Sequence, residues 1–208
     1  RQAELIYAAT GYPFVAVILT PQDVQGGQVT FRVVEGHISD LTVLGLDPIA
    51  RRQVSGAFQP LVGVTPLAIA DVESAYEMAR SIPGLSLAGT LRRGSEPGGM
   101  DLVIQTRRRT WRAYANINNF TAEPVGPWGV LLGVDYNGAS QFGDRTSLQV
   151  YATADLGEQT LVKLDHVRTL NHVGTMLEVQ AVRAWASPRA AVAPLDLATD
   201  VTALNIEL

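Results

Sequence analysis

Cysteine is absent from the 208-residue sequence, which excludes disulfides, thiolate zinc sites and cysteine nucleophiles. No stretch approaches the roughly 18 consecutive apolar residues that a membrane-spanning helix needs. Charged residues make up 17% of the chain and the net charge is -4, so the high charge of a disordered chain and the basic surplus of a nucleic-acid binder are both missing. No secretory leader is visible, and we expect residue 1 to lie at a processing boundary.

Signatures of catalysis are also missing. The three histidines, His37, His166 and His172, show no HExxH-like spacing, and there is no Gly-x-Ser-x-Gly elbow. Asp165 precedes His166, but neighbours on a strand point to opposite faces and cannot form a base and its orienting partner. The glycines of 94–99 lack the lysine of a phosphate loop and indicate a hairpin turn. We therefore expect no enzyme activity, no catalytic residue, no metal site and no cofactor.

The N-terminal half alternates helical and strand patterns. Residues 2–9 predict the end of a helix that stops at Gly11, followed by strands over 14–19 and 29–35. A second series follows, in the order strand, helix, helix, strand, strand, over 38–44, 47–58, 66–82, 85–92 and 100–105. Its helices begin with capping patterns, Asp47-Pro48 and Thr65-Pro66. The first series matches the last three elements of the second, which indicates an internal repeat.

Only strand patterns follow the basic run of Arg107, Arg108 and Arg109. Apolar and polar residues alternate over 111–118, 128–137, 145–154, 160–165, 175–181 and 201–208, which indicates sheets with one apolar and one polar face. The strands are long, and Trp128 and Tyr136 stand about 27 Å apart on one apolar face at roughly 3.4 Å per residue. Both details favour a membrane β-barrel over a soluble β-sandwich, which stays the alternative.

Several spaced motifs resemble those of the outer-membrane transporters of two-partner secretion, which export filamentous haemagglutinins and haemolysins. The N-terminal part carries Gly11-Tyr12, Pro21-Gln22-Asp23, Gly26-Gly27 and Val34-Glu35-Gly36 in the family's order. The strand-rich part carries Ile117 to Phe120 (INNF), Val125 to Trp128 (VGPW), Gly133 to Gly138 (GVDYNG) and Phe142 to Arg145 (FGDR). The likeness therefore extends over essentially the whole chain.

The resemblance implies α+β POTRA domains, each β-α-α-β-β with a three-stranded mixed sheet under two helices, followed by antiparallel strands of a truncated outer-membrane β-barrel. It divides the chain into the C-terminal part of a first POTRA domain (1–36), a second POTRA domain (37–108) and N-terminal barrel strands (109–208). The implied partners are a secreted exoprotein, caught in the periplasm and exported through the barrel, and outer-membrane lipid. No nucleic acid and no small-molecule substrate are implied.

Two candidate sites follow from this interpretation. An extended partner can pair with an exposed sheet edge, and the proposed edge strand comprises Leu85, Ser86, Leu87, Ala88, Gly89, Thr90, Leu91 and Arg92. The alternative is that its leucines only pack under the helices. A polar pore lining is expected from Arg112, Asn116, Asn118, Asp135, Arg145, Gln149, Lys163, Asp165, Glu178 and Gln180. The basic run at 107–109 either steers an acidic partner or lipid phosphate, or is a solvated linker.

Two other functions stay open at this point. A barrel-assembly factor of the same superfamily would share the architecture but act on barrel precursors. A soluble β-rich binding module would share the strand pattern but have no membrane role.

Overall fold

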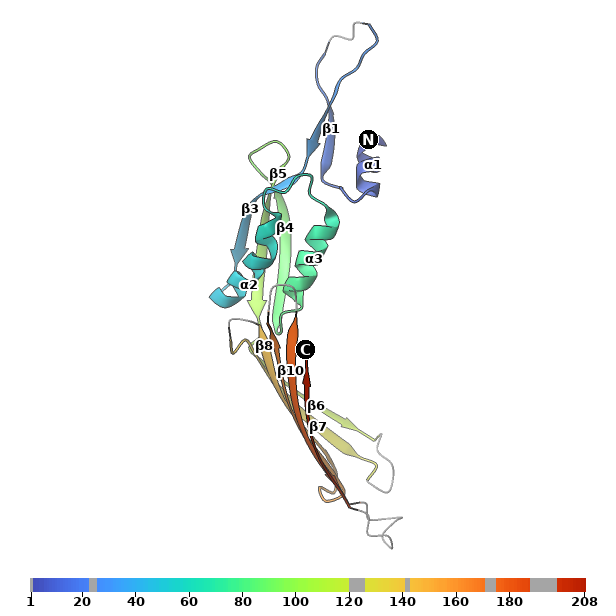
Figure 1. Cartoon of the computed structure of the whole chain (residues 1–208), viewed down its shortest axis with the longest axis vertical. Helices are drawn as coiled ribbons and strands as arrows, with labels where there is room; N and C mark the ends of the chain where they lie inside the picture. Colours follow the sequence, from blue (N-terminus) through green and yellow to red (C-terminus); the bar gives the residue numbers. More distant parts are fainter. Residues whose placement is uncertain (1, 23–25, 120–125, 141–142, 171–174, 188–197) are drawn as a thin grey trace. The chain divides into compact units, whose positions relative to one another are not determined.

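The computed structural model describes residues 2–22, 26–119, 126–140, 143–170, 175–187 and 198–208. The chain forms two compact units. Unit 1 comprises Arg1–Ser81 and Leu85–Arg107, and unit 2 comprises Ile82–Gly84 and Arg108–Leu208 (Figure 1). Unit 1 therefore includes both segments that the resemblance treats as separate domains. Four residues of the motifs lie outside the described residues: Asp23, Phe120, Val125 and Phe142.

Unit 1 begins with a helix and a hairpin. Helix α1 spans Gln2–Ala9, and strands β1 (Val15–Leu19) and β2 (Phe31–Glu35) pair antiparallel. Helix α1 ends at Ala9, and the backbone turns at Gly11, whose φ of 95° suits glycine. The Glu4 carboxylate accepts a hydrogen bond from the Val17 backbone nitrogen at 3.0 Å, which holds α1 against β1. The helix–strand–strand order predicted for this segment is confirmed.

The rest of unit 1 is a three-stranded sheet with two helices. Its elements are β3 (His37–Leu44), α2 (Pro48–Phe58), the short 3-10 helix η1 (Gln59–Leu61), α3 (Ile69–Arg80), β4 (Leu85–Arg93) and β5 (Gly99–Arg108). The strand order is β3-β5-β4, with β3 parallel to β5. This is the predicted order of elements. The central place of β5 leaves β3 and β4 at the two edges of the sheet.

The sequence predicts the start of one helix of this segment correctly and the start of the other wrongly. Asp47 caps α2 as predicted, since its Oδ1 accepts from the Ile49 nitrogen at 2.8 Å. The cap predicted at Thr65 is wrong, because α3 begins at Ile69 and ends at Arg80. Backbone donors ahead of α3 bond to distant carbonyls instead: Leu67 to Gly36 and Ile69 to Gly11, both at 3.0 Å. No local motif reveals such partners.

Unit 1 has an ordinary apolar core. Side chains from β3, α2, β5 and the segment before α3 meet at its centre, where Ile38, Val54, Phe58, Leu67 and Ile104 are each at most 2% exposed. Removing this apolar area from water is the main force that stabilises such a fold. In the described part of the chain, no helix combines the length and the apolarity that crossing a membrane requires.

Unit 2 is a six-stranded antiparallel sheet. Its strands are β6 (Trp111–Asn118), β7 (Gly129–Asn137), β8 (Asp144–Thr153), β9 (Gln159–Thr169), β10 (Met176–Ala186) and β11 (Thr199–Glu207). Each strand pairs with its neighbour in sequence, so β6 and β11 form the two edges. The predicted strands over 160–165 and 175–181 are too short. Polar residues on the apolar face, such as His166 and Arg183, interrupt the alternation while the backbone ladder continues past them.

Candidate functional site

The predicted partner strand lies at the edge of the sheet in unit 1. All eight of its predicted residues, Leu85 to Arg92, belong to β4, which has β5 on one side only. Leu85 is buried and Leu87 half-buried, whereas Leu91 is 38% exposed. The first two leucines therefore pack inward, as the alternative interpretation required, and the last one does not.

A helix side chain already binds the first half of β4, since the Tyr76 hydroxyl donates to the Leu87 carbonyl at 3.1 Å. The Ser86 hydroxyl of β4 donates toward the neighbouring strand, to the Arg107 carbonyl of β5 at 3.1 Å. From Ala88 to Arg93 every residue of the strand is exposed. The part of the edge that can receive another strand is therefore its second half, and the role of the edge in binding stays a prediction.

The register of unit 2 assigns the predicted pore-lining residues to one face. Directly paired residues of an antiparallel sheet share a face, and one such row runs through Arg112, Asp135, Ser147, Asp165 and Gln180. The other predicted residues lie an even number of positions away along the same strands: Asn116, Asn118, Arg145, Gln149, Lys163 and Glu178. All ten are on this polar face. That it lines a pore stays a prediction.

Burial in unit 2 runs opposite to that of a water-soluble sheet. Polar-face residues are buried: Asp135 (8%), Asn137 (5%), Ser147 (4%), Asp165 (4%) and Thr153 (2%). Large residues of the other face are exposed: Leu132 (54%), Leu148 (43%), Leu164 (48%), Leu204 (67%) and Ile206 (66%). The sheet therefore curls around its polar side chains and presents its apolar side chains outward.

Charges of both signs lie together on the polar face. An Arg145 guanidinium nitrogen lies 3.6 Å from Oδ2 of the buried Asp165 carboxylate. The Arg112 guanidinium lies over the Tyr114 ring, 5.5 Å from its centroid. Among the described residues, no group of histidines and carboxylates is arranged to hold a metal ion. This surface suits contact with polar chains and water.

Aromatic side chains bound the apolar face, whose residues alternate with those of the polar face. The Trp111 and Tyr136 rings pack together with centroids 4.4 Å apart. Trp128 directly precedes β7, and Trp185 lies near the end of β10. The register places both at one end of the sheet, whereas Tyr136 lies at the other end. The sequence interpretation identified Trp128 and Tyr136 but missed Trp111 and Trp185, whose strand partners only the register reveals.

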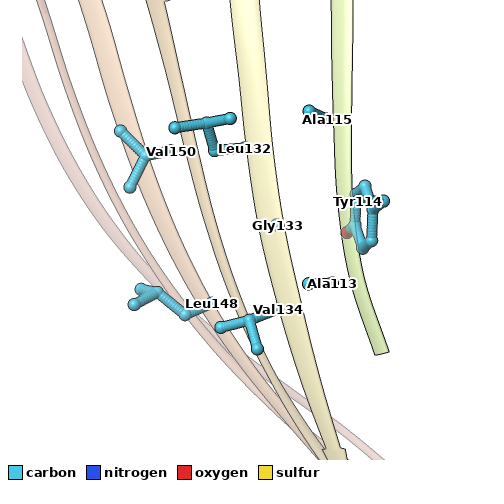
Figure 2. Close-up of a pocket in the computed structure, with 8 residues that line it drawn as sticks. All are labelled: Ala113, Tyr114, Ala115, Leu132, Gly133, Val134, Leu148 and Val150. Carbon is cyan, nitrogen blue, oxygen red and sulfur yellow. The ribbon is translucent and has the colours of Figure 1, made fainter. Parts of the chain in front are cut away.

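A shallow apolar depression of about 530 Å³ lies on this face (Figure 2). Ala113 and Ala115 of β6 leave room beside the larger Leu132 and Leu148 of the neighbouring strands. Tyr114 points the other way in Figure 2, and its ring occupies the space that a side chain at Gly133 would fill. The close-up shows the alternation of the two faces directly.

Neither face is uniform. On the polar face, Asn116 begins a cross-strand row that continues through Leu131, Tyr151, Leu161, Ala184 and Val201. On the apolar face, Arg183 and Asp200 form an ion pair at 3.1 Å. The ten polar residues predicted from the sequence therefore describe only part of their face, because apolar and aromatic side chains also occur on it, from Leu131 of β7 to Val201 of β11.

The basic run is partly packed within unit 2. The Arg109 nitrogen donates to the Gly84 carbonyl at 2.8 Å, and the Asn137 side-chain amide donates to the Arg109 carbonyl at 2.9 Å. The Arg108 guanidinium lies against Gly138. Arg107 and Arg109 are nevertheless exposed, as a solvated linker requires, and Arg108 is half-buried. The interaction of the run with a partner or with lipid stays a prediction.

A curled antiparallel sheet that buries polar side chains, and exposes apolar ones between aromatic residues, is typical of the wall of a transmembrane β-barrel. The comparisons agree. The chain superposes on CdiB from Escherichia coli with a TM-score of 0.59 and 16% identity, covering 86% of this chain and 37% of that one. It superposes on CdiB from Acinetobacter baumannii with a TM-score of 0.57 and 13% identity, covering 99% of this chain and 39% of that one. It superposes on BamA from Haemophilus ducreyi lacking POTRA domains 1–3 with a TM-score of 0.56 and 13% identity, covering 97% of this chain and 38% of that one.

In sequence, the chain is 19% identical over 149 residues to the heme/hemopexin transporter protein HuxB of Haemophilus influenzae. That match covers 71% of this chain and 26% of HuxB, so the chain spans about a quarter of the curated relative's length. No family model matches. The predicted resemblance is confirmed at the level of fold: the chain matches between 37% and 39% of the fold of CdiB, a two-partner secretion transporter, and of BamA.

Proposed function

We propose that the chain is part of an outer-membrane pore that exports a secreted partner protein, in the manner of two-partner secretion. In this proposal unit 2 is barrel wall in the outer membrane, and unit 1 consists of POTRA-type domains in the periplasm. The secreted partner is an exoprotein of the haemagglutinin or haemolysin kind. The chain has no enzymatic role in this proposal.

One observation carries the membrane part of the proposal. In unit 2, leucines such as Leu132 and Leu204 are exposed while Asp135 and Asp165 are buried. In water this arrangement leaves the apolar area unburied and desolvates carboxylates, both of which cost free energy. In a bilayer, lipid against the apolar face removes the first cost, and the nearby Arg145 guanidinium offsets part of the second at Asp165.

The capture step rests on the edge strand of unit 1. A partner segment in extended conformation can add to β4 beyond Leu87, where every residue is exposed. Backbone hydrogen bonds along the edge supply affinity for any extended chain, and alternate side chains supply selectivity. HuxB is a transporter protein, which agrees with an export role.

Two consecutive proline substitutions test edge pairing. Neighbouring strand residues direct their N–H groups to opposite sides of the strand. One of the variants Ala88→Pro and Gly89→Pro therefore removes an N–H group that points to the open edge, and the other removes an N–H group that bonds to β5. Circular dichroism identifies the variant that keeps its fold. We expect that variant to lose binding to the N-terminal secretion domain of an exoprotein encoded beside this chain, measured by calorimetry. Unchanged binding would contradict edge pairing.

Barrel assembly is the second candidate function, because the likeness to BamA covers 97% of the chain at nearly the same TM-score as the likeness to CdiB. The two functions differ in the bound protein. Binding of an unfolded outer-membrane barrel precursor, with no binding of a secretion domain, would favour assembly. The exposed apolar face of unit 2 argues against the soluble binding module.

A further inference from the structure

A groove in unit 1 continues the exposed half of β4. Its volume is about 550 Å³, and its two walls come from different hairpins. One wall is a face of β1 and β2 formed by Phe14, Ala16, Ile18 and Val34. The other wall is the end of β4 from Leu91 with the turn that leads to Met100. A strand added to the edge therefore arrives directly at the groove.

Backbone contacts hold the two walls in place. The His37 nitrogen donates to the Gly98 carbonyl at 3.0 Å, and the turn itself is closed by a bond from the Gly94 nitrogen to the Gly99 carbonyl at 2.9 Å. A side chain at Gly98 would lie 2.5 Å from the Glu35 carbonyl oxygen and 3.0 Å from a Val34 methyl, so only glycine allows this approach. The groove is thus formed before any ligand enters it, which lowers the entropic cost of binding.

The lining indicates what the groove accepts. Ile18 is 48% exposed and Leu91 is 38% exposed, so apolar area on both walls faces the opening. Among the described residues that line it, the charged ones are Arg92, Arg93 and Glu96, so basic charge is in excess. Arg32 adds a further cation, because it lies opposite Ile18 on the same face of the hairpin. An apolar side chain with an acidic neighbour is complementary to this surface.

We propose that this groove is the selectivity site for the secreted partner. An extended segment pairs with β4 through its backbone, inserts an apolar side chain between Ile18 and Leu91, and sets an acidic residue against Arg92 and Arg93. This inference rests on the proposed capture function and adds the side-chain pattern that the partner must carry.

Two neighbouring residues of β1 provide the test and its control. Ile18 points into the groove, whereas Leu19, which is 59% exposed, points to the opposite face of the hairpin. The whole chain in detergent is titrated with the exoprotein secretion domain, and folding is verified by thermal melts. We expect Ile18→Asp to raise Kd at least about tenfold, and Leu19→Asp to change it by no more than about twofold.

Two further variants separate shape from charge. Ala16→Trp fills the groove without adding a charge and should weaken binding as strongly as Ile18→Asp. The double variant Arg92→Glu/Arg93→Glu should slow association and reduce the salt dependence of Kd, as expected for acidic partner residues. Absence of binding to the wild-type chain would overturn the capture function, and this inference with it. Wild-type binding that Ile18→Asp and Ala16→Trp leave intact would overturn the groove alone.

Discussion

The two units of the chain bury opposite kinds of side chain. Unit 1 encloses Phe58, Ile38 and Leu67 and is built as a water-soluble domain is built. Unit 2 encloses Asp135 and Asp165, and Val167 is the single large apolar residue buried among its described residues. Both units belong to one chain of ordinary composition. What differs is whether apolar or polar side chains point into the unit, and this decides which surroundings stabilise each unit.

The difference assigns a physical role to each unit. A unit with an apolar core is stable in water and can present an exposed sheet edge such as β4. A unit with exposed leucines and paired aromatics at its margins is stable against lipid.

Truncating a core residue of unit 1 should cost far more than truncating an outward leucine of unit 2. Phe58 is 2% exposed, so Phe58→Ala should lower the free energy of unfolding by about 3–5 kcal/mol. Leu132 is 54% exposed, and Leu132→Ala should cost less than about 1 kcal/mol in detergent. Denaturant titrations followed by circular dichroism measure both losses. The helical signal reports on unit 1, which contains all the described helices, and the β-sheet signal reports largely on unit 2. Equal losses would contradict the contrast.

Charge placed on the two faces of β8 should have different consequences. Leu148→Arg puts a cation into the apolar belt and should reduce the free energy of membrane folding by roughly 2–4 kcal/mol. Gln149→Arg, one residue along on the polar face, should be nearly neutral. Folding titrations in phosphatidylcholine vesicles measure both variants. Similar penalties for the two would mean that both faces meet the same solvent.

The glycine under Tyr114 should be required for the curl of the sheet. A side chain at Gly133 overlaps the Tyr114 ring, so Gly133→Ala should destabilise unit 2 by about 1–3 kcal/mol. Removing the ring with Tyr114→Ala in the same chain should recover most of this loss. A double-mutant cycle measures the coupling, and simple additivity of the two losses would show that the overlap is relieved in another way.

The smallest effect concerns helix starts. Asp47→Ala removes the cap of α2 and should cost about 1 kcal/mol. Thr65→Ala should change the stability of unit 1 by less than about 0.5 kcal/mol, because Thr65 is exposed and is not the residue that caps α3. Thermal melts compare the two. A loss at Thr65 as large as that at Asp47 would restore the capping role that the sequence suggested.

Local signals predicted most of this fold. Alternation identified every strand of unit 2 and assigned ten polar residues to one face, since side chains on a strand alternate regardless of what surrounds them. The start of α3 escaped prediction because its donors bond to Gly11 and Gly36, far along the chain. The groove also escaped it, since Ile18 and Leu91 are separated by 73 positions and share no motif. Contacts of this kind exist only once the hairpins have packed.

The measurement that tests the central claim most directly is a cysteine scan of β8. The chain has no native cysteine, so single replacements at Leu148, Gln149, Val150 and Tyr151 can be labelled without background. In lipid vesicles, we expect a water-soluble maleimide to modify positions 149 and 151 and to spare 148 and 150. Uniform labelling, or labelling of 148 and 150 alone, would contradict the assignment of the apolar face to lipid.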